Sequence, residues 1–468
     1  MMDITRFEGL ELEDRSVGIV GLGIEGVDLA RFLCRRNASV TISDAKNAAQ
    51  LADRINEVDD LPVRLSFGSD QSEDLNTADL VFVSQGVPLE LPGLKALSSR
   101  GVPLLSMTSL FLDWCPGPIV GITGSSGKTT TTALVSAMFE ADERPFFMGG
   151  NIGVGLLDRL SEIRPYTWSI LEISHTQLQL VDRSPHVAAI LNITPNHLDR
   201  FAWDEYRALK TNIIRYQEPH DIAVLGWDDP KCREAEALVK GTLQRFSMSS
   251  DMPGDGVFVR SGRAMWRQGR RVEQLFALSD VRLRGAHNQS NAVAAAAIAL
   301  ACGIAAEAIS CAVETFSGVP HRLEYVAELE GVSYYNDSIA TTPERTVAGI
   351  RSFEEPLVLL LGGRDKNLPM DELAREAAKH CRRVVVFGEA TDKLSAAFSD
   401  AGITKLVARA ETLENAIEQA REAAVPGDVV LLSPACTSYD AYENFERRGE
   451  HFRSLIRQMI KEVEPSLR

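Results

Sequence analysis

The sequence predicts a three-domain α/β protein, and three observations support that prediction. Short apolar runs alternate with helix-like stretches from residue 16 into the last third of the chain. Polar or glycine-rich turns follow many of these runs, as they do where the strands of a parallel sheet end. The 468 residues also exceed the length that one core usually organises, which is about 300 residues.

The composition indicates an acidic globular protein. Apolar residues make up 45% of the chain and charged residues 24%, which is enough material for several cores. The formal net charge is −16 and no segment is rich in Lys or Arg, so we expect no nucleic-acid partner. If the substrates are anionic, positive charge must be concentrated in a cleft.

Cysteine usage and hydropathy predict the compartment. The seven cysteines are scattered without a CxxC pair, which argues against a disulfide framework or a zinc knuckle. Residues 1–9 are charged and lack the apolar region of a signal peptide. The longest apolar run, 292–306, is rich in Ala and shorter than the roughly 20 residues that span a bilayer. We therefore expect a cytoplasmic protein with no membrane partner, in which this run is a buried helix. We also expect a monomer.

The first domain is expected at residues 1–115 and should be Rossmann-like. Strand-like runs at 16–22 and 39–42 flank a helix-like stretch at 27–35, and a further run follows at 80–84. Gly21, Gly23 and Gly26 lie at the first strand–helix turn, and Asp44 ends the second strand. Such a turn brings a diphosphate close to a helix N-terminus. A nicotinamide cofactor, another nucleotide diphosphate and a purely structural turn all remain open.

The second domain is expected at residues 116–319, after a Pro/Gly-rich break, with a central parallel sheet. Its strand-like runs are at 119–122, 168–173, 187–192 and 222–225. Residues 252–281 alternate over short stretches and predict a small antiparallel insertion before the alanine-rich helix. A break at 318–320 ends this domain.

The strongest local signal is a phosphate-binding loop, or P-loop. It extends from Gly121 to Thr130 between a strand and a helix, although Ile122 stands where the strict Walker pattern has Gly. Backbone N–H groups of such a loop surround phosphates, the lysine reaches the β and γ oxygens and the threonine hydroxyl can ligate Mg²⁺. The ATP-binding prediction covers Gly124, Ser125, Ser126, Gly127, Lys128, Thr129 and Thr130.

Polar residues also end the next strands of this sheet. Glu172 ends one strand and can ligate magnesium, while a cluster from Asn192 to Arg200 ends the following strand. Asn288 and Asn291 lie three residues apart at the start of the alanine-rich helix, so they should share one face. They suit an adenine edge, although a helix cap would explain one of them.

The third domain, residues 320–468, is expected to be Rossmann-like as well. Strand-like runs at 357–361, 383–387 and 429–432 alternate with amphipathic helices such as 370–380. Polar clusters follow several predicted strands, at 335–341, 361–366 and 432–438. We expect this domain to bind a second substrate and to close over the nucleotide.

Taken in this order, the motifs resemble those of the Mur ligases over nearly the whole chain. The Gly150 to Gly153 segment, the Ser-Pro-Ala-Cys-x-Ser stretch at 433–438 and the Asn-Phe-Glu-x-Arg-Gly stretch at 444–449 resemble the members that add glutamate. The resemblance implies an ATP-dependent amide ligase acting through an acyl phosphate. Its implied substrates are UDP-N-acetylmuramoyl-L-alanine and glutamate, with ATP, two Mg²⁺ sites and a carbamate on Lys210.

The resemblance also implies roles for individual residues. Lys128, Glu172, His197 and Lys210 would be catalytic, and Thr129, Glu172, His197 and Lys210 would serve the metal ions. UDP-substrate contacts would be Gly23, Ile24, Glu25, Asp44, Gly86, Asn151 and Gln177. Nucleotide contacts would include Asn288, Asn291, Arg322 and Asp337, and the glutamate pocket would be formed by Thr341, Lys366, Ser438 and Phe445.

Two departures from the family pattern bear on the substrate. Ile339 stands where the common pattern has Lys, and His175-Thr176 replaces Ser-Phe. A similar Asp-Ser-Ile stretch occurs in relatives that attach L-glutamate, although D-glutamate is favoured here. The alternatives are an L-glutamate-adding ligase, a folylpolyglutamate synthase-like ligase, an NAD-dependent oxidoreductase and a non-catalytic ATP-binding switch.

Overall fold

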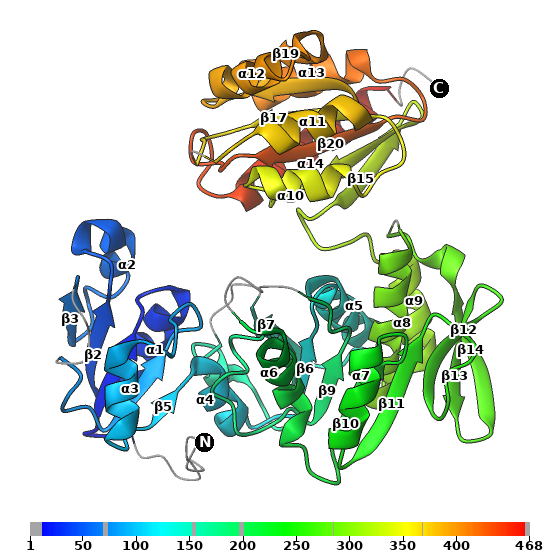
Figure 1. The fold of residues 1–468 in the computed structure, drawn as a ribbon. Helices are drawn as coiled ribbons and strands as arrows, with labels where there is room; N and C mark the ends of the chain where they lie inside the picture. Colours follow the sequence, from blue (N-terminus) through cyan, green and yellow to red (C-terminus); the bar gives the residue numbers. More distant parts are fainter. Residues whose placement is uncertain are drawn as a thin grey trace. The chain divides into compact units, whose positions relative to one another are not determined.

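The computed structural model describes residues 12–68, 74–151, 156–195, 201–283, 285–366 and 368–463. The chain forms two compact units: unit 1 comprises Met1–Val281 and Ala286–Thr315, and unit 2 comprises Arg282–Gly285 and Phe316–Arg468. Unit 1 contains two sheets and unit 2 contains one, each with its own helices (Figure 1). The predicted three-domain α/β fold is therefore confirmed.

The first sheet of unit 1 has five parallel strands in the order β3-β2-β1-β4-β5. β1 is the middle strand of this sheet, and four of its five residues are buried there. The elements are β1 (Ser16–Val20), α1 (Ile24–Cys34), β2 (Ser39–Asp44), α2 (Ala52–Asn56), β3 (Val63–Phe67), β4 (Leu80–Val83), α3 (Pro92–Ser99), β5 (Leu104–Leu105) and α4 (Met107–Trp114).

The second sheet of unit 1 has nine strands in the order β14-β13-β12-β11-β10-β9-β6-β8-β7. Its strands are β6 (Ile119–Thr123), β7 (Phe146–Gly150), β8 (Trp168–Glu172), β9 (Val187–Ile190), β10 (Ile222–Gly226), β11 (Thr242–Ser247), β12 (Gly256–Arg260), β13 (Arg263–Gln268) and β14 (Arg271–Ala277). The antiparallel pairing expected within 252–281 is confirmed for β12–β13 and β13–β14, but the segment is not a separate insertion. β12 pairs with β11 in parallel, so the β12–β14 meander extends the central sheet.

Helices cover this second sheet (Figure 1). They are α5 (Lys128–Ala141), α6 (Trp203–Arg215), α7 (Pro230–Ala235), α8 (Ala286–Ala301) and α9 (Ala306–Thr315). The buried alanine-rich helix is confirmed, but it ends at Ala301 because Gly303 adopts the left-handed conformation with φ 74°. Among the described residues, no helix is both long and apolar enough to cross a membrane.

Unit 2 contains a six-stranded sheet in the order β15-β16-β20-β17-β18-β19, in which only the β15–β16 pair is antiparallel. Its elements are β15 (Glu324–Leu329), β16 (Val332–Asn336), α10 (Pro343–Ile350), β17 (Leu357–Gly362), α11 (Asp371–His380), β18 (Cys381–Phe387), α12 (Thr391–Asp400), β19 (Val407–Arg409), α13 (Leu413–Ala423), β20 (Val429–Ala435) and α14 (Phe445–Val463). Alternate residues of β17 and β20 enter two separate apolar clusters, one with α10–α12 and one with α13–α14. The sheet is therefore covered on both faces.

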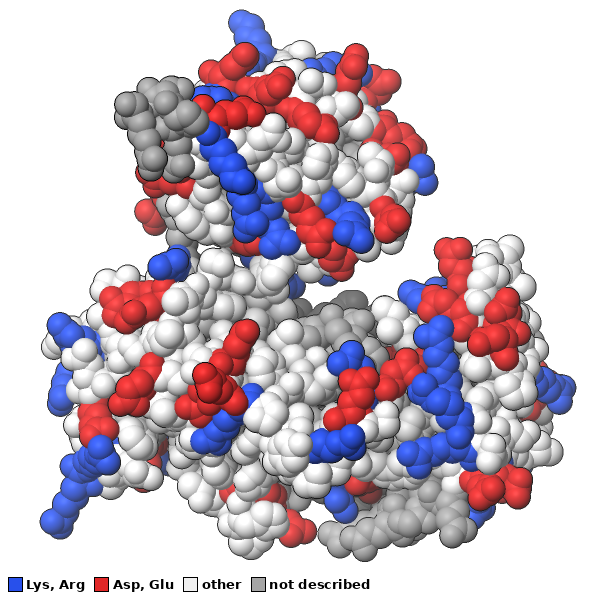
Figure 2. All heavy atoms as spheres, turned by 180° about the vertical axis from the view of Figure 1, so that it is seen from behind, with Lys and Arg blue, Asp and Glu red and all other residues white. Residues whose placement is uncertain are grey.

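Acidic and basic side chains are interspersed on the face drawn in Figure 2. The described residues on this face therefore form no extended patch of one charge. The polar groups that could bind an anionic substrate lie instead at the carboxyl ends of the strands.

Candidate active site

The predicted P-loop connects the carboxyl end of β6 to the N-terminus of α5 in unit 1. Gly127 caps α5 with φ +80°, a left-handed conformation that favours glycine. A Cβ atom on Gly127 would lie 2.3 Å from Asn291 Oδ1, so the loop passes directly against the start of α8. The free N–H groups of the first α5 turn face the loop and make it suitable for an anion.

A second loop, after β9, holds the P-loop in shape. Asn192 Oδ1 accepts a hydrogen bond from Ser126 N (2.9 Å), and Asn192 Nδ2 donates to Ser126 O (3.2 Å). Ser125 Oγ donates to Thr194 O (2.9 Å) and accepts from Thr194 N (3.0 Å). Asn192 therefore fixes the conformation of the P-loop at Ser126. Sequence reasoning noted its motif but did not predict this residue as part of the site.

Two lysines meet at one carbonyl of the loop. Lys128 Nζ donates to Gly124 O (3.0 Å), and Lys210 Nζ, from α6, donates to the same oxygen (2.7 Å). Lys210 is only 1% exposed, and its ammonium lies 4.9 Å from the centre of the Tyr206 ring. Burial, together with the charge of Lys128, lowers the pKa of Lys210 to about 7. A large fraction of Lys210 is therefore a neutral, nucleophilic amine near neutral pH.

Glu172 ends β8 beside the P-loop, since it pairs with Ile122 of β6. Its Oε1 accepts a hydrogen bond from Asn151 Nδ2 (2.9 Å). Its Oε2 is buried and has no hydrogen-bond partner among the described residues. An orphaned carboxylate oxygen next to a phosphate-binding loop suits a magnesium ion, which prefers oxygen ligands. Thr129, the other predicted ligand of this kind, is half-buried in the first turn of α5, and His197 lies outside the described residues.

The two predicted asparagines of α8 share one helix face. Asn291 Nδ2 donates to Asn288 Oδ1 (3.1 Å), and Asn291 lies against Gly127. The structure thus brings Asn291 to the loop that would hold the phosphates.

The glycine-rich turn of the first domain has the close approaches that its pattern predicts. Gly21 adopts φ +99°, and a Cβ on Gly26 would lie 2.2 Å from Gly21 O. Asp44 accepts hydrogen bonds from Leu22 N (2.8 Å) and Lys46 N (2.9 Å), so its carboxylate organises this turn. Apart from the adjoining residues of the chain, no described residue comes within 4 Å of a Cβ built on Gly23 or Gly86, which leaves space for a ligand there.

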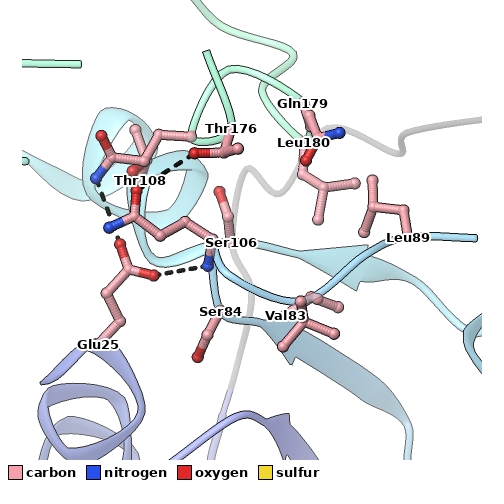
Figure 3. Close-up of a pocket in the computed structure, with 12 residues that line it drawn as sticks. Glu25, Val83, Ser84, Leu89, Ser106, Thr108, Thr176, Gln179 and Leu180 are labelled. Carbon is pink, nitrogen blue, oxygen red and sulfur yellow. Dashed lines mark hydrogen bonds between the residues drawn. The ribbon is translucent and has the colours of Figure 1, made fainter. Parts of the chain in front are cut away.

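Glu25 joins the first domain to the central one within unit 1. Its Oε2 accepts from Gln85 N (2.9 Å) and its Oε1 accepts from Gln177 Nε2 (3.3 Å). Gln85 Oε1 in turn accepts from Ser174 Oγ (3.1 Å). Glu25, Gln85 and Gln177 line a small pocket together with Thr108 and Thr176 (Figure 3). Burial raises the pKa of Glu25.

In unit 2, the predicted residues are of two kinds, those expected to contact the nucleotide and those expected to form the glutamate pocket. Asp337 is buried, its Oδ2 accepts from Ser433 Oγ (2.8 Å), and burial raises its pKa to about 7. Lys366 Nζ donates to Thr341 Oγ1 (3.2 Å), which brings together two residues of the predicted glutamate pocket. Arg322 is exposed. Ser438 is 2% exposed, and Phe445 begins α14.

Comparison with known proteins decides the family. Family models match in sequence order: the MurD-like N-terminal domain of Mur ligases at residues 15–106, the Mur ligase middle domain at 122–299 and the Mur ligase glutamate ligase domain at 321–436. A UDP-N-acetylmuramoylalanine--D-glutamate ligase from Symbiobacterium thermophilum is 41% identical over 96% of this chain and 99% of its own. One from Koribacter versatilis is 38% identical over 97% and 99%.

The chain belongs to the Mur ligase family. Solved structures agree on the fold. A UDP-N-acetylmuramate-alanine ligase from Thermotoga maritima has a TM-score of 0.52 at 18% identity, covering 95% of this chain and 100% of that one. MurF from Acinetobacter baumannii also gives 0.52 at 18% identity, covering 95% and 93%.

This Mur ligase contains a second organising residue, Arg448, which the Asn-Phe-Glu-x-Arg-Gly motif includes but to which sequence reasoning gave no role. Arg448 is fully buried in α14, and its guanidinium donates to the carbonyls of Ser338, Gly362, Cys436 and Thr437 at 3.0–3.2 Å. These carbonyls lie at or just after the carboxyl ends of β16, β17 and β20, where the polar clusters occur. Burial lowers the pKa of Arg448 to about 10. The arginine thus fixes the loops that carry the predicted glutamate pocket.

Proposed function

We propose that this Mur ligase joins D-glutamate to UDP-N-acetylmuramoyl-L-alanine, with conversion of ATP to ADP and phosphate. The product is a peptidoglycan precursor, so the reaction would take place in the cytoplasm and support cell-wall synthesis, cell shape and division. The observation that supports this most strongly is the full-length similarity to relatives named UDP-N-acetylmuramoylalanine--D-glutamate ligase, 41% and 38% identical to this chain.

The reaction proceeds by two displacements. The alanyl carboxylate attacks the γ-phosphorus of ATP, which forms an acyl phosphate and releases ADP. The glutamate amine then attacks the acyl carbon, loses a proton and expels inorganic phosphate, which leaves an amide. Both reacting partners in the first step are anionic, so positioning and charge neutralisation provide most of the rate acceleration.

The P-loop would hold the triphosphate. Its backbone N–H groups and Lys128 would neutralise the β and γ oxygens, with the loop kept in shape by Asn192. Asn291, beside Gly127, and Asn288 would contact the nucleotide. Lys128 donates to Gly124 O in this structure, and a γ-phosphate offers it a stronger, charged acceptor.

Thr129 and Glu172 would hold one magnesium ion, and Lys210 and His197 would serve a second. When bound, these ions neutralise the charge that accumulates on the transferring phosphoryl group. Glu172 suits this role because its Oε2 is buried without a partner among the described residues. Lys210 would suit it once its neutral amine has combined with CO₂, which yields a carbamate and a proton and so provides an anionic oxygen donor.

The first domain would bind the UDP moiety at Gly23, Ile24, Asp44 and Gly86, where the two glycines leave open space. Glu25, Gln177 and Asn151 would lie along the path from UDP to the reacting carboxylate. In unit 2, Thr341, Lys366, Ser438 and Phe445 would form the glutamate pocket, and Arg322 and Asp337 would contact the nucleotide.

The test is phosphate release from ATP in the presence of UDP-N-acetylmuramoyl-L-alanine, with D-glutamate, L-glutamate or no amino acid, followed by mass measurement of the product. A parallel set of reactions contains a folate in place of the UDP substrate. Turnover with D-glutamate supports the proposal. Turnover with L-glutamate alone would show that the enzyme adds L-glutamate, and the residues around Ile339 would then be the first candidates for that specificity. Turnover only when a folate replaces the UDP substrate would favour the folylpolyglutamate synthase-like alternative.

A further inference from the structure

Two histidines and an aspartate gather at the amino-terminal edge of the central sheet. His186 directly precedes β9 and Asp221 directly precedes β10. These strands are parallel neighbours in which Val187 pairs with Ile222, so the residues before them also lie opposite each other. The P-loop follows the carboxyl end of β6, which is parallel to β9. The cluster therefore lies at the sheet edge opposite the nucleotide loop.

The spacing of the three side chains suits a metal ion. His186 Nδ1 lies 2.9 Å from Asp221 Oδ1, and His220 Nε2 lies 3.5 Å from the same oxygen. Tetrahedral zinc, with bonds of about 2.0–2.2 Å, keeps its ligand atoms roughly 3.3 Å apart. The first separation is shorter than that value because His186 and Asp221 are hydrogen-bonded in this structure, and the second is slightly longer. In the described part of the chain, this is the single group of three or more His, Cys, Asp or Glu ligand atoms within 4.8 Å of one another.

The backbone that carries these ligands is held in place before any ion binds. Asp221 Oδ2 accepts from Glu218 N (2.7 Å), which leaves Oδ1 facing the imidazoles. Gln217 is fully buried and donates to Pro185 O (3.2 Å) and Ile222 O (2.9 Å), so it connects the two segments. Binding of an ion would therefore cost little additional conformational entropy of the backbone.

The surroundings provide further negative charge and an entry path. Glu218 Oε2 lies 3.9 Å from His220 Nδ1, the ring nitrogen that faces away from Asp221. This distance is too long for a hydrogen bond, but the carboxylate adds negative charge beside the cluster, which favours a cation. The His220 side chain is 70% exposed and that of His186 is 36% exposed, so an ion can enter and water can take a fourth position.

We infer that His186, His220 and Asp221 bind a divalent transition-metal ion of the zinc type, at a site separate from the nucleotide site. Two imidazoles with one carboxylate match zinc, whereas magnesium prefers oxygen ligands alone. The bound ion connects the amino ends of β9 and β10 and stabilises that edge of the sheet. This inference does not depend on the proposed ligase activity.

The test is calorimetric titration of Zn²⁺ alone into the full-length, tag-free, EDTA-treated protein. Wild type should bind one Zn²⁺ that His220→Ala binds at least tenfold more weakly or not at all. Glu172→Gln, which alters the nucleotide site, and His380→Ala, which removes a surface histidine beside Glu376, should bind it as wild type does. His220 is mostly exposed, so its loss should not prevent folding.

Three outcomes would overturn the inference: no Zn²⁺ binding by wild type, equal binding by His220→Ala, or loss of binding in Glu172→Gln. Co²⁺ gives an independent readout, because a low-symmetry histidine-carboxylate site produces visible absorption. That absorption should be present in wild type and His380→Ala and absent from His220→Ala.

Discussion

Replacement of Lys210 tests whether its buried amine forms a carbamate that the ligase reaction requires. Lys210→Met keeps an unbranched apolar side chain in the same space but cannot form a carbamate. Lys210→Arg keeps a cation that never becomes neutral. Lys210→Ala removes most of the side chain and opens a gap beside Gly124, whose carbonyl Lys210 contacts at 2.7 Å.

The structure sets the size of the effect. The pKa of Lys210 falls from 10.5 to about 7, which corresponds to about 5 kcal/mol in favour of the neutral amine. At pH 7.5 about three quarters of Lys210 is then neutral, compared with about 0.1% of an ordinary lysine. Burial therefore increases the reactive form several hundredfold. Loss of one preorganised charged group at a phosphoryl-transfer site typically lowers kcat by about 100- to 1,000-fold, which we expect for all three variants.

Two assays follow the carbamate directly. Protein equilibrated with ¹³C-bicarbonate should show a carbamate carbon resonance that Lys210→Met lacks. Acetate should partly restore the activity of Lys210→Ala, because a free carboxylate can occupy the gap, but should not rescue Lys210→Met, whose side chain fills it. Wild-type kcat in Lys210→Met, or the same ¹³C resonance in that variant, would refute the reasoning.

Four further outcomes are expected. Lys128→Ala should abolish phosphate release without lowering Tm, since this lysine acts on phosphate and not on the core; retained activity would exclude the P-loop assignment. Glu172→Gln should raise the Mg²⁺ concentration for half-maximal activity at least tenfold, and an unchanged Mg²⁺ titration would contradict its role as a ligand. Ile339→Lys should alter the KM for glutamate with little change for ATP; if neither changes, residue 339 does not help form the amino-acid pocket. The folded-state pKa of Lys210 is depressed, so its contribution to stability is fully present above pH 10.5 and is lost as the pH falls to about 7. In CO₂-free buffer, the Tm of wild type relative to that of Lys210→Met should therefore rise from pH 7 to pH 9.5. The same pH dependence of Tm in both proteins would contradict a buried amine at this position.

The strands were predictable because their signal is local. The run at 119–122 became β6 (Ile119–Thr123) and that at 357–361 became β17 (Leu357–Gly362), each buried throughout. A strand covered on both faces is a continuous apolar run, which the sequence displays directly. The partner of each strand is not local. The β12–β14 segment therefore looked like an insertion, although it belongs to the central sheet.

The candidate site was predictable where a motif is contiguous and less so where residues distant in sequence meet. The P-loop residues lie together because the chain is continuous there. The hydrogen bond between Glu25 and Gln177 joins residues 152 positions apart, and that between Lys210 and Gly124 joins residues 86 apart. Lys210 stood out only through the family resemblance, because its burial cannot be read from the surrounding helix. Arg448 belongs to the Asn-Phe-Glu-x-Arg-Gly motif, but its role became visible only through its buried carbonyl partners.

The central claim is amide ligation through an acyl phosphate, and oxygen transfer tests it most directly. UDP-N-acetylmuramoyl-L-alanine labelled with ¹⁸O at both oxygens of its alanyl carboxylate would be converted with ATP and D-glutamate, and the released phosphate would be analysed by mass. The account predicts one ¹⁸O atom in each phosphate and a product heavier by one glutamate residue. Unlabelled phosphate, with product formed, would contradict activation of this carboxylate by phosphoryl transfer.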